Sequence, residues 1–223
     1  MAKGWRWVLG AAAVLGAGFA ALRVQGRRRP APMAAGWERF FLDNPVRRRF
    51  FGPDRVLAVL GDVRDGRVGE IGTGVGVILE ALARAVGPGG MVYGVDVQPQ
   101  AVEMTRRRLA RRVPEVPVEV AVADATRLPW PDAALDRVVM VAVLGEVPAA
   151  RRPAVLAEVR RVLRPGGRLI VTEFWPDPHY IPEAALTRFL AEHGFQVRAR
   201  HGETALVYSL AAEPAGGEPD GQA

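Results

Sequence analysis

The sequence predicts an α/β fold in which a seven-stranded, mostly parallel sheet carries helices on both faces and ends in an antiparallel hairpin. Strand-like and helix-like segments alternate from Arg67 onward, which is typical of a parallel sheet with crossover helices. The almost continuous apolar run at 135–144 indicates a central strand that is buried on both faces. Two strand-like segments near the end of the chain flank a turn at 201–203, and this arrangement predicts the hairpin.

The expected strands and helices follow one another in order along the chain. The strands are expected at 67–71, 91–96, 116–122, 135–144, 168–174, 195–200 and 204–210. The helices are expected at 77–86, 99–112, 148–163 and 182–193. Pro117 removes a backbone donor near the start of the third strand, which favours an edge position for that strand. Gly194 is a typical residue to end the last helix.

The stretch 68–76 contains a short strand that carries a carboxylate, Glu70, near its end and continues into a glycine-rich turn. The glycines of this turn are Gly72, Gly74 and Gly76. Glycine permits a positive φ and lets a ligand approach the backbone, while the amides that open the next helix form an electropositive rim. We therefore expect the turn to hold a nucleotide-like ligand, with a purely structural turn as the alternative.

The spacing and charge of this turn distinguish between nucleotide-like ligands. A dinucleotide-binding turn has the pattern G-x-G-x-x-G, and its third glycine would fall here on Val77. The carboxylate of Glu70 would repel a pyrophosphate, and it suits a ligand with a positive amino group. Asp96 ends the second expected strand, where it is placed to accept hydrogen bonds from two ribose hydroxyls. S-adenosylmethionine has a ribose, a cationic end and no phosphate, so it is favoured over NAD and an oxidoreductase is disfavoured.

With these features the chain resembles the class I S-adenosylmethionine-dependent methyltransferases. Residues 70–76 resemble the first motif of that family, 94–96 the second and 123–125 the third, and 163–167 resemble the turn before the fifth strand. The resemblance spans roughly Arg67 to Leu210 and implies a Rossmann-like sheet with S-adenosylmethionine as the cofactor. The cofactor-binding residues that it implies are Glu70, Gly72, Thr73, Gly74, Gly76, Asp96, Val97, Asp124 and Ala125.

The resemblance also implies which part of the cofactor each side chain would contact. Glu70 would act on the methionine amino group, and Asp96 would bind the ribose hydroxyls. Val97 would pack on the adenine ring, and Asp124 and Ala125 would border the edge of that ring.

Catalysis makes few demands on the protein, because the methyl group is already activated on a sulfonium and mainly has to be aligned with its acceptor. A weakly acidic acceptor such as a phenol or enol would also need a base. The candidate catalytic residues near the strand ends are Glu146, Glu173 and His179. Residues 172–174 are similar to the ubiquinone/menaquinone-biosynthesis branch and related lipid methyltransferases, whereas 143–146 replace an Asn-containing motif of that branch. The acceptor therefore stays open between a quinone precursor and a phospholipid-like molecule.

An apolar run at residues 5–24 predicts a single-pass transmembrane anchor. A helix of this length spans about 30 Å, which matches the thickness of the bilayer core. More basic residues follow the run than precede it, and this asymmetry places the main domain on the cytoplasmic side. A cleaved signal peptide, suggested by the small residues around Phe19, and a helix buried in a soluble domain are the alternatives.

The charge of the 223-residue chain is unevenly distributed. The chain has a net charge of +6, while residues 1–50 contain ten basic and two acidic side chains, so this segment carries +8 and the rest −2. A basic segment beside an apolar run favours an anionic membrane surface over nucleic acid. We expect the arginines of the helix at 99–112 to be solvated or paired, so nucleic acid is an unlikely partner. The absence of cysteine excludes disulfides, thiolate metal sites and cysteine nucleophiles, and the three histidines are not spaced as metal ligands.

These patterns divide the chain into four parts. They are a membrane anchor with a basic flank at 1–29, a linker and helical cap at 30–66, the methyltransferase domain at 67–212 and a disordered tail at 213–223. The expected function is that of a membrane-anchored methyltransferase acting on a small, lipophilic acceptor. The alternative is a non-catalytic domain that binds S-adenosylmethionine at a membrane. The oligomeric state stays open.

Overall fold

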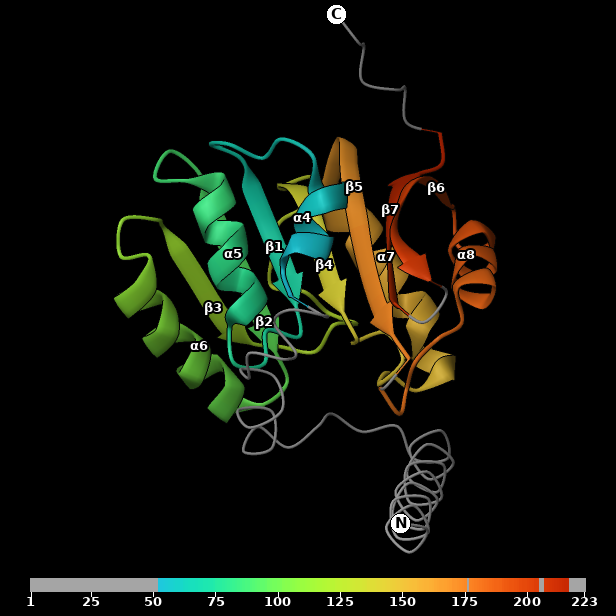
Figure 1. The fold of residues 1–223 in the computed structure, drawn as a ribbon, viewed down its shortest axis with the longest axis horizontal. Coiled ribbons are helices and arrows are strands. Elements are labelled where there is room, and N and C mark those ends of the chain that lie inside the picture. Colours follow the sequence, from blue (N-terminus) through green and yellow to red (C-terminus); the bar gives the residue numbers. More distant parts are fainter. Residues whose placement is uncertain (1–51, 176, 205–206, 217–223) are drawn as a thin grey trace, which may run out of the picture.

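A single seven-stranded sheet forms the centre of the molecule, which we describe from a computed structural model for residues 52–175, 177–204 and 207–216. The strand order is β3-β2-β1-β4-β5-β7-β6 (Figure 1). Neighbouring strands from β3 to β5 run parallel, and β7 lies antiparallel between β5 and β6. The predicted fold, a mostly parallel Rossmann-like sheet with a C-terminal antiparallel hairpin, is confirmed.

The elements have the following bounds. The strands are β1 Arg67–Ile71, β2 Met91–Asp96, β3 Val118–Val122, β4 Leu135–Val141, β5 Leu163–Phe174, β6 Phe195–Thr204 and β7 Val207–Pro214. The helices are α4 Asp54–Leu60, α5 Val77–Val86, α6 Pro99–Arg112, the 3-10 helix η1 Ala149–Arg151, α7 Arg152–Val162 and α8 Glu183–Glu192.

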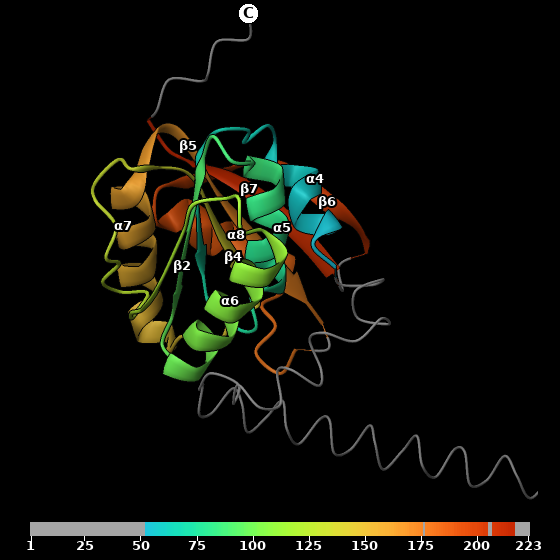
Figure 2. The same ribbon diagram turned by 90° about the vertical axis from the view of Figure 1, so that its left-hand side faces the viewer.

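Two hydrophobic cores lie on opposite faces of the sheet, because alternate strand residues point to opposite sides. On β4, for example, Val138 belongs to the core beneath α7 and α8, and Val139 belongs to the core beneath α4, α5 and α6. Figure 2 shows α7 on one side of the sheet and α5 and α6 on the other. The predicted covering of both faces by helices is therefore confirmed.

The predicted positions of β3 and β4 within the sheet are confirmed, and their ends differ from the prediction. β3 lies at one edge, as the proline indicated, but it begins at Val118, after Pro117 rather than before it. β4 lies between β1 and β5 and ends at Val141 instead of continuing to Leu144. The reason is that Ala142 has φ 56°, a left-handed conformation that takes the chain out of the strand.

The predicted turn at 163–167 is an irregularity within β5 rather than a separate turn. Leu163 already pairs with Leu135, and the register then shifts before Arg168 pairs with Arg137. The helix expected at 148–163 is divided into η1 and α7, with Pro153 in the first turn of α7, where its missing N–H has no consequence. The helix expected at 182–193 is one residue shorter at each end.

The hairpin strands are longer than predicted. β6 continues through His201 and Gly202 to Thr204, so the expected turn at 201–203 is a register irregularity of the ladder. β7 extends to Pro214, and Glu213 pairs with Gln196. The first residues of the expected disordered tail therefore belong to the sheet, because Glu213 also accepts hydrogen bonds from Arg168 and Arg198.

The membrane anchor, its basic flank and most of the predicted linker and cap lie outside the described residues. Within the described ranges, no helix is long and apolar enough to cross a membrane. The described end of the cap is α4, which packs its buried Val56 and Leu60 into the same core as α5.

Candidate functional site

A cavity of about 360 Å³ opens at the carboxyl ends of the parallel strands. Its walls come from the segments that follow β1, β2, β3 and β4, and Asp177 after β5 completes them. The strand order reverses direction between β1 and β4, and ligands of open α/β sheets bind at such a switch point. The cavity lies where the sequence predicted the cofactor.

Glu70 is a buried carboxylate in the wall of this cavity. Burial raises its pKa well above the ordinary value, and the nearby Asp96 carboxylate raises it further, while a backbone N–H of Leu79 partly offsets both. Glu70 Oε2 and Thr73 Oγ1 have no hydrogen-bond partner among the described residues, although both are buried. Buried polar atoms without partners are uncommon, so these two atoms fit a ligand that supplies a positive, hydrogen-bond-donating group.

Asp96 connects the end of β2 to the glycine turn. Its Oδ2 accepts a hydrogen bond from the N–H of Gly74 at 3.0 Å, and its Oδ1 accepts one from the N–H of Gln98 at 2.9 Å. Each carboxylate oxygen can accept a further hydrogen bond, so these contacts orient the side chain without exhausting it. Asp96 lines the cavity and can still accept hydroxyl donors there.

The glycines of the turn have different structural roles. Gly72 lines the cavity with φ 78°, and a Cβ at this position would approach the Cγ2 atom of Val143 to 2.3 Å. Gly76 has φ 77° and precedes α5, and a Cβ there would meet Thr105 at 3.0–3.1 Å. Gly76 is not among the cavity-lining residues, so its position is explained by the close approach of α6 rather than by a ligand.

The segment after β3 forms another wall of the cavity, which the half-exposed Val97 also lines. Asp124 and Ala125, two of the residues predicted to bind the cofactor, line it. Asp124 Oδ1 accepts hydrogen bonds from the N–H and the hydroxyl of Thr126, and Oδ2 accepts one from Arg151 at 2.7 Å. The backbone N–H of Thr126, followed by the Arg151 guanidinium, lowers the pKa of Asp124, so this carboxylate is ionised.

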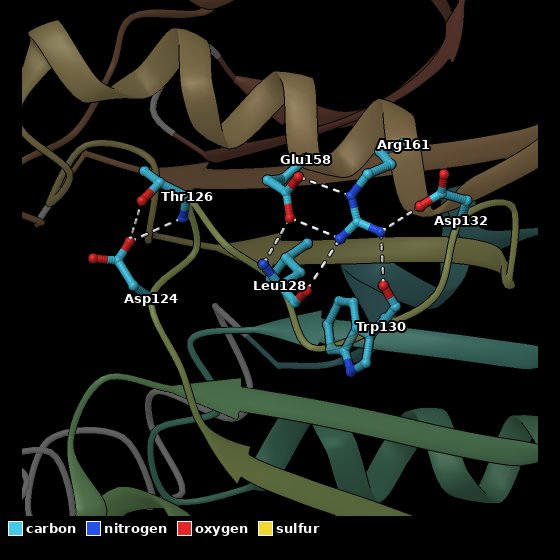
Figure 3. A network of polar contacts seen from close by, with 7 residues as sticks. All are labelled: Asp124, Thr126, Leu128, Trp130, Asp132, Glu158 and Arg161. Carbon is cyan, nitrogen blue, oxygen red and sulfur yellow. Dashed lines mark hydrogen bonds and ion pairs between the residues drawn. The ribbon is translucent and has the colours of Figure 1, made fainter.

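Arg161 on α7 binds the segment between β3 and β4, as Figure 3 shows. Its guanidinium donates to the carbonyl oxygens of Leu128 and Trp130 and to the carboxylates of Asp132 and Glu158. Glu158 in turn accepts a hydrogen bond from the N–H of Leu128. The wall that contains Asp124 is therefore anchored to α7 at several backbone positions.

The candidate catalytic residues lie around the loops that follow β4 and β5. Glu146 lines the cavity, whereas Glu173 and His179 do not. Asp177, which the sequence reasoning missed, also lines the cavity, and its Oδ1 accepts a hydrogen bond from the His179 N–H and lies 3.7 Å from His179 Nδ1. His179 therefore contacts Asp177, which lines the cavity, and does not line the cavity itself.

Glu173 is almost completely buried beneath these loops. Its Oε2 accepts a 3.3 Å hydrogen bond from the N–H of Ile181, and its Oε1 has no partner among the described residues. The pKa of Glu173 is raised to about 8, mainly by burial and in smaller part by the charge of Asp177, while the Ile181 N–H and the charge of Arg152 oppose the shift. The side chain is consequently a neutral carboxylic acid at pH 7.

The loops that follow β4 and β5 are packed directly against each other. A Cβ on Gly145 would lie 2.0 Å from the carbonyl oxygen of His179, so only glycine fits this contact. Arg152 of α7 donates hydrogen bonds to the carbonyl oxygens of Gly145 and Val147. The positions of Asp177 and Glu146 in the cavity wall are therefore fixed together.

Eight of the nine predicted cofactor-binding residues line the cavity, with Gly76 as the exception. Arg151, which also lines it, was missed because a single arginine among many carries no sequence signal of its own. Within the described ranges, no group of three or more histidine, aspartate and glutamate side chains is arranged to hold a metal ion.

Comparison with known proteins connects this cavity to a family. Residues 68–167 match the family described as a methyltransferase domain. The chain is 39% identical over 114 residues to the ubiquinone/menaquinone biosynthesis C-methyltransferase UbiE of Bordetella avium, an alignment that covers 51% of this chain and 43% of that protein. It is 31% identical over 167 residues to the protein of the same name from Cupriavidus pinatubonensis, with 66% of each chain covered. The chain thus spans less than two thirds of the length of these curated relatives.

A solved structure supports the same assignment at the level of the fold. The crystal structure of a SAM-dependent methyltransferase from Aquifex aeolicus has a TM-score of 0.73 and 24% sequence identity, and the match covers 81% of this chain and 98% of that one. Through the domain at 68–167, the chain belongs to the class I S-adenosylmethionine-dependent methyltransferases, and S-adenosylmethionine is its cofactor.

Proposed function

We propose that the protein transfers a methyl group from S-adenosylmethionine to a small, lipophilic acceptor of the quinone-precursor class. The observation that carries the proposal is the buried Glu70 carboxyl at the cavity wall, whose Oε2 atom has no partner among the described residues. Such a group suits the positive amino end of this cofactor and disfavours a phosphate-containing one.

Each of these cavity residues then contacts a different part of the cofactor. Glu70 holds the amino end, Asp96 accepts hydrogen bonds from the ribose hydroxyls, and Val97 and Ala125 pack against the adenine. When bound, the cofactor supplies a methyl group that is activated by its sulfonium. The contribution of the protein is to orient the acceptor, to exclude water and to receive any proton that the acceptor loses.

We place the acceptor beside the loops that follow β4 and β5. Glu146 and Asp177 line the cavity there and can accept hydrogen bonds from acceptor hydroxyls. Glu173 and His179 would act through Asp177, since neither lines the cavity. A hydroxylated aromatic ring is favoured over a phospholipid headgroup, because relatives of this chain are named as quinone C-methyltransferases.

We also propose that residues 1–29 tether the protein to a membrane, with the methyltransferase domain on the cytoplasmic side. The support is the apolar run at 5–24 and the basic residues that follow it. A tether suits an acceptor that is itself dissolved in the bilayer.

The proposal is tested with purified full-length protein in lipid vesicles and S-adenosylmethionine labelled in the methyl group. The vesicles contain phosphatidylethanolamine and a prenylated hydroquinone that lacks one ring methyl group. Label in the hydroquinone supports the proposal, and label in the phospholipid shows a headgroup acceptor instead. If the protein binds the cofactor calorimetrically but transfers no label, the non-catalytic alternative is favoured.

The matched control for this experiment is Asp96→Ala. It removes the acceptor for the ribose hydroxyls, so affinity for the cofactor should fall by about 1–3 kcal/mol. Unchanged affinity in this variant would contradict the ribose assignment.

A further inference from the structure

We propose that Asp177 is the catalytic base that takes the proton from a hydroxyl of the methyl acceptor. The inference rests on the proposed function, because it takes the acceptor to be a hydroxylated aromatic ring beside the loops that follow β4 and β5. Glu173 and His179, two of the predicted catalytic candidates, then support this base and do not act on the acceptor themselves.

Asp177 is a buried carboxylate that is held in one orientation at the cavity wall. Its Oδ1 accepts a hydrogen bond from the His179 N–H at 2.7 Å, and its own N–H donates to the carbonyl oxygen of Phe174 at 3.0 Å. Its carbonyl oxygen accepts a hydrogen bond from the N–H of Tyr180. Glu146, which also lines this side of the cavity, is only partly buried. A general base has to stay within hydrogen-bond reach of the proton that it takes, so Asp177 suits this role better than Glu146.

Glu173 binds the same short loop as Asp177. The N–H of His179 donates to Asp177, and the N–H of Ile181, two residues later, donates to Glu173 Oε2. Carboxylates that interact repel one another when both are charged, so their surroundings decide which of them keeps a proton. Burial and the charge of Asp177 raise the pKa of Glu173 to about 8, so Glu173 keeps the proton. Asp177 is then the ionised member of the pair, and it is the member that faces the acceptor.

Two buried polar atoms in contact with this pair are not used by the fold. Glu173 Oε1 and His179 Nε2 have no hydrogen-bond partner among the described residues. An unpaired buried polar atom costs about 1–3 kcal/mol, and such groups with strongly shifted pKa values gather at functional sites. The Nδ1 atom of His179 lies 3.7 Å from Asp177 Oδ1, which is too far for a hydrogen bond. The backbone N–H of His179 therefore orients Asp177, and its ring does not.

Other elements around Asp177 also carry ionisable groups. Arg152 binds the carbonyl oxygens of Gly145 and Val147, and its charge acts on Glu173. The titratable and charged groups of the elements around Asp177 are Glu146 of the loop after β4, Arg152 of α7, Glu173 of β5, His179 and Tyr180 of its own loop and Tyr208 of β7.

The proposed step leaves Asp177 unchanged at its end. Asp177 takes the proton from the acceptor hydroxyl, and the electron pair left on the oxygen is delocalised into the ring. The neighbouring ring carbon takes the methyl group, and the electrons of the broken C–S bond remain on the sulfur. The ring carbon then releases its hydrogen to water as a proton, the ring becomes aromatic again, and Asp177 returns its own proton to the oxygen.

The test measures the single-turnover rate of methyl transfer to the hydroquinone that lacks one ring methyl group. Full-length protein in vesicles is compared at pH 7 and pH 8, below the range in which Glu173 is mostly ionised. Without a base on the protein, the rate would follow the ionised fraction of a phenol with a pKa of about 10 and would rise about tenfold. We expect the wild-type rate to change by less than about twofold. Asp177→Asn should be at least about 100-fold slower at pH 7, and its rate should show the tenfold rise.

The controls separate a lost base from a damaged fold. The amide oxygen of Asp177→Asn can still accept the His179 N–H, so its circular dichroism melt and its affinity for S-adenosylhomocysteine should match the wild type. Asp177→Glu restores a carboxylate and should recover at least about tenfold of the lost rate. Glu183→Gln removes a carboxylate that pairs with Arg200 and does not line the cavity, so it should keep the wild-type rate.

Three results would overturn the inference. They are a wild-type rate that itself rises tenfold between the two pH values, an Asp177→Asn variant that keeps the wild-type rate, and a larger loss in Glu173→Gln than in Asp177→Asn. The first of these is measured on the wild type alone, so it decides even where a variant does not fold. If the wild type binds S-adenosylhomocysteine but transfers no label to the hydroquinone, the proposed function fails, and the base assigned to it fails with it.

Discussion

At the scale of single residues, the cavity is defined by two acids on neighbouring strands. Glu70 is the residue before the last of β1, Asp96 ends β2, and the charge of Asp96 is one cause of the raised pKa of Glu70. Asp96 is fixed by two backbone N–H groups, whereas one oxygen of Glu70 has no partner among the described residues. Glu70 therefore has a carboxylate oxygen that is left for a bound cation.

We expect cofactor binding to release a proton from Glu70. In the free protein the raised pKa favours the protonated form of this carboxyl, and a positive amino group beside it favours the ionised form, so the pKa falls on binding. Affinity should consequently rise with pH until Glu70 is already ionised in the free protein. Calorimetry in buffers with different ionisation enthalpies measures the released proton, which should be absent in Glu70→Gln. Equal heats in all buffers for the wild type would contradict this assignment.

Glu173 gives a prediction about stability. The unfolded chain loses this proton near the ordinary pKa of 4.5, whereas the folded protein retains it up to about 8. The folded state thus binds the extra proton, so stability falls as pH rises from about 4.5 to 8 and levels off above that range. Glu173→Gln stays neutral at every pH, so its stability relative to the wild type should increase across this window, by up to about 1.4 kcal/mol per pH unit.

Urea unfolding of both proteins at pH 5, 7 and 9 measures this difference. The other titrating groups are common to both proteins, so the difference curve isolates Glu173. A difference in unfolding free energy that does not change with pH would show that Glu173 is ionised in the folded protein.

At the scale of elements, the segment between β3 and β4 depends on α7. Arg161 contacts two of its carbonyl oxygens, and Glu158 contacts one of its N–H groups. Arg161→Met should destabilise the protein by about 1–3 kcal/mol, since charged hydrogen bonds to buried carbonyls are lost. It should also accelerate hydrogen exchange at the Leu128 amide. The matched control is Arg164→Met, which removes a more exposed ion pair with Asp136 and should cost less than about 1 kcal/mol.

The sequence was sufficient where a local pattern determines the structure. The apolar run of β4 predicted its central position, and Pro117 predicted the edge position of β3. The spacing of the motifs predicted that Glu70, Asp96 and Asp124 lie close together, because the carboxyl ends of parallel strands meet at one edge of a sheet. All three line the cavity.

The remaining features depend on contacts between segments that are distant in sequence. Arg151 and Asp177 enter the cavity wall through loops whose paths follow from packing, such as the contact of Gly145 with His179. The end of β4 was missed because alanine gives no signal for a left-handed conformation. Gly76 was predicted to bind the cofactor because nothing in the sequence near Gly76 indicates that Thr105 of α6 packs closely against it.

At the scale of the whole molecule, the residues that line the cavity lie between Glu70 and Asp177, far in sequence from the predicted anchor. A chain that begins at Pro30 should therefore be soluble, fold and bind the cofactor. Its activity on a water-soluble hydroquinone should match that of the full chain, and its activity on hydroquinone in vesicles should fall, because a tether raises the local concentration of enzyme at the membrane. Equal activity on vesicles would count against a membrane-dissolved acceptor. Failure of the shortened chain to fold would show that residues 5–24 pack on the domain.

The walls of the cavity come from positions as far apart as Glu70 and Asp177. No short stretch of the described residues contains the whole cavity, so the cofactor has no complete site until β1 to β4 are paired and the loops beyond them are in place. Its binding energy is then added to the finished native state and is absent from the early steps of folding. The cofactor should slow unfolding without speeding folding, so that a cell rich in S-adenosylmethionine protects completed molecules from proteases and leaves nascent ones to fold unaided.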